Sequence, residues 1–246
     1  MDKQLSLSKI IKNDIMASMN FNIKPIFSFK KKKKERKLKS SSRTIFIHIP
    51  KTAGSLIRKN IINSEGTHLI QKHKPDKPIL DLDNKKFDDF FIFTSIRNPW
   101  DRLISAFFHL LDPDADISDE YRELIKKFKD NFELFVKELE HDPELQNIIY
   151  LKPQIYWLKK YGKRKIDFII RYEHLLEDLQ KLSKIININF EITKKINAGK
   201  HKHYSEYYDE VTKKIVEKIY EEDIKILGYK FEGGPEKVTG NNIDNN

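Results

Sequence analysis

The chain has 246 residues, of which 39% are hydrophobic and 11% aromatic, so it can bury one sizeable core and fits one large α/β domain better than two. It contains no cysteine, which excludes disulfides and thiolate metal sites, and no apolar run approaches the roughly 20 residues that span a bilayer. The formal charge is +10, of which the block Lys30–Lys39 contributes +7 and the rest of the chain +3. We therefore expect a soluble, cytoplasmic protein with a near-neutral folded body.

The expected domain organisation follows from where the hydrophobic pattern is dense. Residues 1–42 are predicted to be a basic, flexible leader, residues 43–231 one folded domain, and residues 232–246 a disordered tail. Within the leader, Lys30–Lys39 is predicted to be a solvated linker, and contact with the inner face of a membrane or with a polyanionic acceptor is the open alternative. Aromatic residues are not interleaved with these lysines, so nucleic acid is not an expected partner. The sequence does not indicate an oligomeric state.

Strand and helix patterns alternate along the body. Apolar runs rich in Ile and Phe predict strands at Thr44–Ile49, Phe90–Ile96 and Lys165–Arg171. Apolar residues at helical spacing predict helices within residues 56–62, 100–111, 121–135, 175–182 and 211–220. Strands separated by helices predict the α/β class, with a central parallel sheet flanked by helices and ligands bound at the carboxyl ends of the strands.

The first motif, His48-Ile-Pro-Lys-Thr-Ala-Gly-Ser55, follows the first predicted strand. Its Lys51 precedes Gly54, whereas a nucleotide triphosphatase loop has glycine directly before lysine, which disfavours an ordinary ATPase or kinase. Lys51 supplies a positive charge, Gly54 a close backbone approach, and Thr52 and Ser55 hydroxyls at the start of a helix. The motif therefore predicts a site for a 5′-linked anionic group.

The second motif, Arg97-Asn-Pro-Trp-Asp-Arg-Leu-Ile-Ser105, follows the second predicted strand. Pro99 suits the first turn of a helix, and Ser105 lies two turns along it. Arg97 can donate a forked pair of hydrogen bonds to a second phosphate, and the Ser105 hydroxyl can add a third. The alternative is that Arg97 forms a structural ion pair with Asp101 and that Ser105 only packs against the sheet.

The two motifs together resemble those of the carbohydrate sulfotransferases that use 3′-phosphoadenosine 5′-phosphosulfate (PAPS), the group containing the glycosaminoglycan 2-O-sulfotransferases and their bacterial relatives. His48–Ser55 matches the segment that binds the 5′-phosphosulfate in this family, and Ile96–Ser105 matches the segment that binds the 3′-phosphate. Further family-like segments are Pro153–Leu158, Phe168–Glu173 and Tyr204–Tyr229, so the likeness covers about residues 43–231. The resemblance implies the P-loop-like sulfotransferase fold.

The resemblance also implies an activity, namely transfer of the sulfuryl group from PAPS to a hydroxyl of a carbohydrate or glycolipid, without a metal. The donor-binding residues that it implies are Lys51, Thr52, Ala53, Gly54, Ser55, Arg97, Ser105 and Lys200. Lys51 is also expected to stabilise charge on the leaving oxygen. Relatives place the general base between the two motifs, where this chain has His73, the favoured candidate, and His68, the second.

One departure from the family pattern is that Leu56 follows Ser55, where relatives commonly have a second hydroxyl residue. The missing hydrogen bond is expected to weaken donor binding without abolishing the chemistry. Two other functions stay open, a divergent P-loop kinase of small molecules and a non-catalytic polyanion- or membrane-binding protein on the same fold. Acceptor specificity is expected from the variable loops at residues 112–119 and 140–152, whose composition does not name a sugar.

Overall fold

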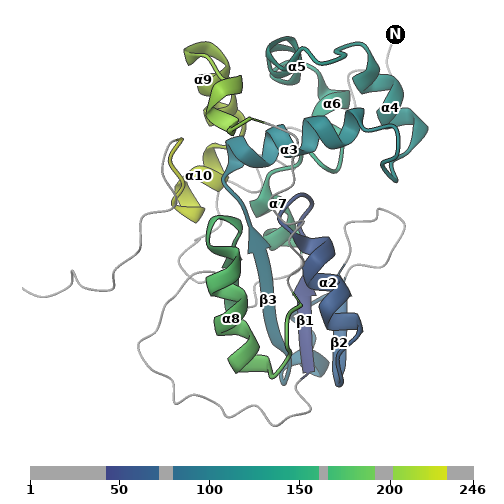
Figure 1. The fold of residues 1–246 in the computed structure, drawn as a ribbon, viewed down its shortest axis with the longest axis vertical. Coiled ribbons are helices and arrows are strands. Elements are labelled where there is room, and N and C mark those ends of the chain that lie inside the picture. The colour runs from purple at the N-terminus through teal and green to yellow at the C-terminus, as the bar shows by residue number, and fades with distance from the viewer. Residues whose placement is uncertain (1–42, 72–79, 161–165, 192–201, 232–246) are drawn as a thin grey trace, which may run out of the picture.

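The computed structural model describes residues 43–71, 80–160, 166–191 and 202–231, which form one central sheet with helices around it (Figure 1). No helix in these four segments is long and apolar enough to cross a membrane. Several predictions fall outside the described residues: the leader with Lys30–Lys39, His73, Lys200 and the tail at 232–246.

The sheet has four strands, and each neighbouring pair is parallel, in the order β2-β1-β3-β4. The strands are β1 (Arg43–Ile47), β2 (Thr67–Gln71), β3 (Phe91–Ile96) and β4 (Phe168–Arg171). Three of them confirm the strands predicted from apolar runs. Strand β2 was not predicted, because an edge strand that carries His68 and Gln71 lacks the continuous apolar run of a buried strand.

Helices make up most of the rest of the described chain. They are α2 (Gly54–Ile62), α3 (Pro99–Leu111), α4 (Asp119–Lys126), α5 (Phe132–Leu139), α6 (Pro143–Asn147), α7 (Gln154–Lys160), α8 (Leu175–Ile186), α9 (Glu210–Ile219) and α10 (Glu221–Leu227), with short 3₁₀ turns η1 (Lys85–Phe87), η2 (Tyr172–His174) and η4 (Tyr204–Tyr207). The single helical pattern predicted for residues 121–135 is in fact two helices. They are separated where Lys129 adopts a φ of 52° and the Asn131 side chain caps α5 by accepting from the Leu134 N–H.

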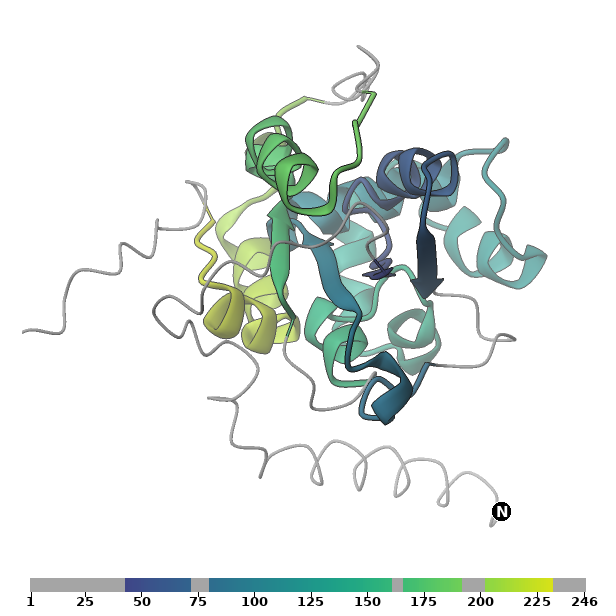
Figure 2. The ribbon, with the colours of Figure 1, turned by 90° about the horizontal axis from the view of Figure 1, so that it is seen from below.

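The sheet is covered on both faces because alternate strand residues point to opposite sides. Phe46 and Phe93 pack against helices α2 and α8, while Ile45 and Ile47 pack against α7 and the end of α10. Figure 2, which views the sheet from below, shows this layering. Continuous apolar strands such as β1 are therefore the sequence signature of burial on two faces.

A third apolar cluster, centred on Phe107, joins α3, α4, α5, α6 and α9 beyond the carboxyl ends of the strands. Figure 1 shows α3 crossing above the end of β3 toward which its arrow points. Helix α3 is buried on most of its circumference, so it forms a fixed wall at the end of the sheet where parallel α/β proteins bind ligands.

Candidate functional site

The strand order creates a switch point between β1 and β3. From β1 the chain passes to β2 on one side, and it then returns to form β3 on the other side of β1. Ligands of open α/β sheets bind outside the carboxyl ends of the two strands at such a point. Residues 48–53 follow β1 and Arg97 follows β3, so the structure brings both predicted anion motifs to this position.

The loop after β1 has an unusual backbone conformation. Lys51 and Ala53 both lie in the left-handed region, with φ of 67° and 66°. For residues with a Cβ, this conformation costs about 1–2 kcal/mol each. Ala53 is the N-cap of α2, and no side chain caps that helix. The loop therefore directs the uncapped, electropositive start of a nine-residue helix toward the switch point, where Ser55 is exposed.

The Thr52 side chain does not point to the ligand side of this loop. Its hydroxyl is fully buried, donates to the Ile49 carbonyl at 2.9 Å and lies 2.8 Å from the Ser95 hydroxyl. A hydroxyl has one proton, which Thr52 uses on Ile49, so Ser95 donates to Thr52. These bonds argue against the prediction that the Thr52 hydroxyl holds the donor phosphate, because the hydroxyl ties the loop to strand β3 instead.

The backbone of Gly54 lies directly against the buried ring of His48. A Cβ at this position would lie 1.9 Å from Cδ2 and 2.1 Å from Nε2 of the buried His48 ring, which stacks on Phe46 at 5.7 Å between ring centroids. His48 thus packs beneath the loop. Gly54 lets the helix start rest directly on this ring.

Lys51 carries a perturbed ammonium group. Partial burial, together with repulsion from Arg97, lowers the pKa of Lys51 from 10.5 to about 8, although Asp112 opposes the change. Arg97 is also bonded to the same residue, since its Nη1 donates to the Lys51 carbonyl at 3.3 Å. Two cationic residues, one after β1 and one after β3, are therefore held close together, and bound anionic groups would reduce the repulsion between them.

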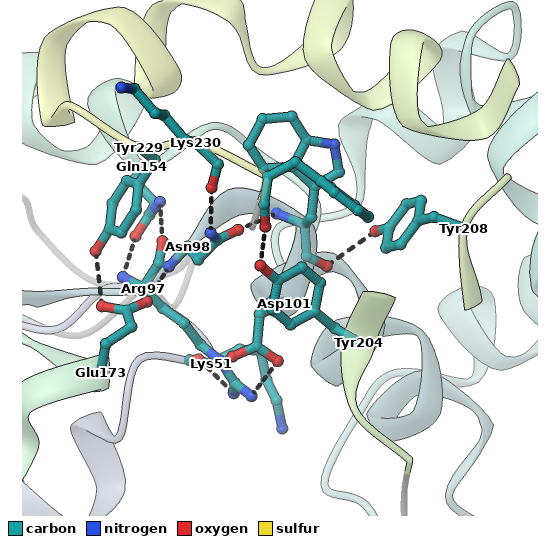
Figure 3. A network of polar contacts seen from close by, with 12 residues as sticks. Lys51, Arg97, Asn98, Asp101, Gln154, Glu173, Tyr204, Tyr208, Tyr229 and Lys230 are labelled. Atoms are coloured by element: carbon teal, nitrogen blue, oxygen red, sulfur yellow. Dashed lines mark hydrogen bonds and ion pairs between the residues drawn. The ribbon is translucent and has the colours of Figure 1, made fainter. Parts of the chain in front are cut away.

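Arg97 is held in place on three sides, and Figure 3 shows its contacts with Asp101 and Lys51. Nε and Nη2 form a forked ion pair with Asp101 at 2.7 and 2.8 Å, and the guanidinium lies 3.9 Å from the centroid of the Tyr172 ring. The structural ion pair between Arg97 and Asp101, which was the alternative to phosphate binding by Arg97, is thus present. With the bond to Lys51, Arg97 uses three of its five N–H groups on described residues, which leaves one on Nη1 and one on Nη2 for a phosphate.

The backbone around Arg97 is fixed by buried polar side chains. Gln154 accepts from the Arg97 N–H at 2.9 Å and donates to the Arg97 carbonyl at 2.8 Å. The Asp223 carboxylate, whose pKa burial raises, accepts from the backbone N–H groups of Gln154 and Ile155. The sequence pattern did not indicate Gln154 and Asp223 as parts of the site, although both lie within the family-like segments.

Glu173 also fixes the backbone of the second motif, on the Asn98 side of Arg97. Its carboxylate accepts from the Asn98 N–H and from the Tyr229 hydroxyl, while burial raises its pKa. Asn98 in turn caps α3 by accepting from the Trp100 N–H, and Pro99 occupies the first turn as predicted. The end of β4 therefore supports the second motif through Tyr172 and Glu173.

Arg102, a residue of the second motif, is bonded to the backbone of the first motif. It is 1% exposed and donates to the carbonyls of Pro50 at 3.4 Å, of Tyr150 at 3.2 Å and of Lys152. Pro50 belongs to the loop after β1, and Tyr150 and Lys152 precede α7. One guanidinium thus fixes the anion loop against helix α3 and the segment before α7.

Of the two candidate base residues, His73 lies outside the described residues and His68 lies within them. His68 lies near the start of β2, where its Nδ1 is 2.8 Å from the Thr44 hydroxyl and its Nε2 is 2.8 Å from the Glu65 carbonyl. Its register partner Thr44 is three residues before the end of β1, about 10 Å along the strand. His68 is therefore at the opposite end of the sheet from Lys51, which argues against it as the base.

The fold and the geometry of the site indicate a class of protein. An α/β sheet that places two cationic motifs and an uncapped helix start at its switch point is typical of enzymes that bind a phosphorylated nucleotide. A sequence model of the sulfotransferase family matches residues 34–230, and the chain belongs to this family.

Two individual proteins show further similarity. An uncharacterized protein of Archaeoglobus fulgidus is 31% identical over 120 residues, which cover 49% of this chain and 87% of that protein. Among solved structures, mouse sulfotransferase SULT7A1 complexed with PAP is 12% identical with a TM-score of 0.43, covering 75% of this chain and 84% of that chain.

Proposed function

We propose that this protein transfers the sulfuryl group from PAPS to a hydroxyl of a carbohydrate or glycoconjugate. Membership of the sulfotransferase family supports sulfuryl transfer in general. The observation that carries the choice of donor is the pairing of Lys51 with Arg97 across the switch point, where the Arg97 Nη1 is 3.3 Å from the Lys51 carbonyl. Two adjacent cations suit a nucleotide with separate 5′ and 3′ anionic groups.

In this proposal each anionic group has its own binding residues. Lys51, the backbone of Ala53 and Gly54, and the Ser55 hydroxyl at the uncapped start of α2 bind the 5′-phosphosulfate. Arg97 binds the 3′-phosphate through its remaining N–H groups, and Ser105, partly exposed on α3, donates a further hydrogen bond. Lys200 remains a predicted contact of the 3′-phosphate outside the described residues.

The chemistry is a displacement at sulfur. The acceptor oxygen forms a bond to sulfur as the bond between sulfur and the 5′-phosphate oxygen breaks, and that electron pair passes to the leaving phosphate. The products are a sulfate ester and 3′,5′-ADP, and the proton of the acceptor hydroxyl passes to a base. The Lys51 ammonium and the start of α2 stabilise the charge that develops on the leaving oxygen.

We assign the base to His73, since His68 lies at the far end of the sheet. His73 is outside the described residues, so this assignment depends on its position in the sequence between the motifs. His73→Ala is expected to abolish most turnover while His68→Ala retains it. Equal turnover in both variants would contradict the assignment.

Donor class is tested by thermal-shift titration of the wild-type protein with 3′,5′-ADP and with ADP. The proposal predicts that 3′,5′-ADP raises the melting temperature more strongly, because only this nucleotide has a 3′-phosphate for Arg97. Arg97→Ala should remove the preference between the two ligands. A preference for ADP in the wild type, or no shift with either ligand, would contradict the proposal and favour a kinase or a non-catalytic protein.

A further inference from the structure

One face of α3 extends from the proposed 3′-phosphate site to the far end of the helix. Asp101, Ser105 and His109 follow one another at four-residue intervals and are all partly exposed, so they form a row on one side of α3, here called the polar row. Phe108 flanks this row and packs edge-on against Tyr207 at 5.5 Å. The buried residues of the helix are Pro99, Trp100, Arg102, Leu103, Ile104, Ala106, Phe107 and Leu110.

The loop that carries Lys51 lies at the Asp101 end of the polar row. The Arg97 Nη1 donates to the Lys51 carbonyl at 3.3 Å, and the same guanidinium is paired with Asp101. The Lys51 ammonium also interacts electrostatically with Asp112, which follows the last residue of α3. Ser105 is the middle member of the polar row, and His109 lies one turn, about 6 Å, beyond it.

The far end of the polar row meets an aromatic side chain. The His109 ring contacts the Tyr150 ring edge-on, with centroids 5.0 Å apart, and Tyr150 also packs against Tyr121. Arg102 holds the backbone of Tyr150 through its carbonyl. Because Arg102 also holds the Pro50 carbonyl, this aromatic pair is fixed relative to the loop that carries Lys51.

The charge beyond His109 is negative. Residues 112–120 include four aspartates and one glutamate and contain neither lysine nor arginine. Arg122 fixes this turn by donating to the main-chain carbonyls of Asp112 and Ala115, and its positive charge offsets one of the five carboxylates. An anionic acceptor approaching Lys51 along the polar row would pass these carboxylates and be repelled.

Building on the proposed sulfuryl transfer, we propose that His109 and Tyr150 bind the acceptor and that the acceptor is an uncharged sugar rather than an anionic polysaccharide. The imidazole of His109 can form a hydrogen bond with a sugar hydroxyl, and the aromatic ring of Tyr150 can pack against the C–H groups of a pyranose. The acceptor then extends from the outer end of α3 toward Lys51, where sulfuryl transfer takes place.

The class of acceptor is tested with labelled PAPS and two sets of glycans at equal mass. One set is neutral and contains oligosaccharides of glucose, galactose, mannose and N-acetylglucosamine; the other is anionic and contains heparosan and chondroitin. The proposal predicts that label enters the neutral set. Label in the anionic set, or in neither, overturns the assignment of an uncharged sugar.

The two residues are tested on the best neutral acceptor. His109→Gln and Tyr150→Ala are each expected to lower kcat/KM for the acceptor by at least about tenfold, while the Kd for 3′,5′-ADP stays within about twofold of wild type. Tyr150→Phe keeps the ring and should retain activity. His141→Gln is the matched control, since its side chain is 79% exposed on the surface beyond α5.

The outcomes separate this inference from the proposed function. Unchanged kcat/KM in His109→Gln and Tyr150→Ala, with normal binding of 3′,5′-ADP, overturns the acceptor site alone. Loss of 3′,5′-ADP binding in these variants would show that they disturb the donor site, which also contradicts the inference. Failure of the wild type to bind 3′,5′-ADP overturns the donor assignment itself.

Discussion

The ring of His48 fills the space in which a side chain on Gly54 would begin, with Cδ2 only 1.9 Å from the position of a Cβ. Both residues belong to the first motif, and neither has a positive φ; that conformation is adopted instead by Lys51 and Ala53. The glycine is therefore needed for packing between the start of α2 and the end of β1. This packing fixes the position of the loop that carries Lys51 relative to the sheet.

Gly54→Ala is expected to destabilise the fold by about 1–3 kcal/mol or more, because the new methyl group overlaps a buried ring. The measurement is the free energy of unfolding in urea. His48→Ala removes the overlapping ring, so the double variant should be more stable than the two separate losses together imply. Simple additivity of the two changes would contradict the contact.

Thr52→Val and Ser95→Ala test the buried hydroxyl pair. Each variant should lose about 1–3 kcal/mol of stability, and the double variant less than the sum, because the two hydroxyls bond to each other at 2.8 Å. The Kd for 3′,5′-ADP, measured by calorimetry, should change little in either variant. A large loss of affinity in Thr52→Val alone would show that its hydroxyl does reach the ligand.

Lys51→Met is expected to separate stability from activity. The pKa of Lys51 falls from 10.5 to about 8 on folding, so at pH 7 its charged form destabilises the fold, and the uncharged methionine should raise Tm. Transfer of the sulfuryl group should fall by about 10²–10³, the usual loss when a group that stabilises a leaving anion is removed. Lys59→Met, at an exposed position of α2, is the control and should leave both quantities unchanged.

Donor binding should weaken with rising pH. Because the pKa of Lys51 is about 8 in the free protein, its ammonium is lost above that pH, and affinity for 3′,5′-ADP should then fall, approaching tenfold per pH unit. Stability changes in the opposite direction: between pH 8 and 10.5 the unfolded chain binds more protons at this group, so the free energy of unfolding rises with pH. In Lys51→Met, affinity should be low and nearly independent of pH, and a retained pH dependence would point to another group.

The sequence allowed prediction of the features that depend on local pattern. The strands at Thr44–Ile49 and Phe90–Ile96 have continuous apolar runs, and Pro99 with Ser105 marked the helix that follows the second motif. Strand β2 was missed because edge strands have no such run. The spacing between Lys51 and Arg97 did not by itself show that they are neighbours, since that follows from the pairing of β1 with β3.

The directions of the side chains in the first motif could not be predicted from the sequence. Thr52 and Ser55 looked equivalent as hydroxyl donors, but the left-handed residues of the loop turn one inward and leave the other exposed. The support that Gln154 and Glu173 give to the second motif depends on contacts 57 and 75 residues apart, which local pattern does not show.

The hydrogen bonds of Arg102 have a consequence for how relatives of this protein can diverge. Because one guanidinium binds the Pro50 and Tyr150 carbonyls together, backbone changes around Tyr150 are transmitted to the donor loop. The turn at 112–119 has no such bond to Pro50 among the described residues. New acceptor preferences should therefore arise, in evolution or by loop grafting, through residues 112–119, while the backbone at 150–152 stays constant.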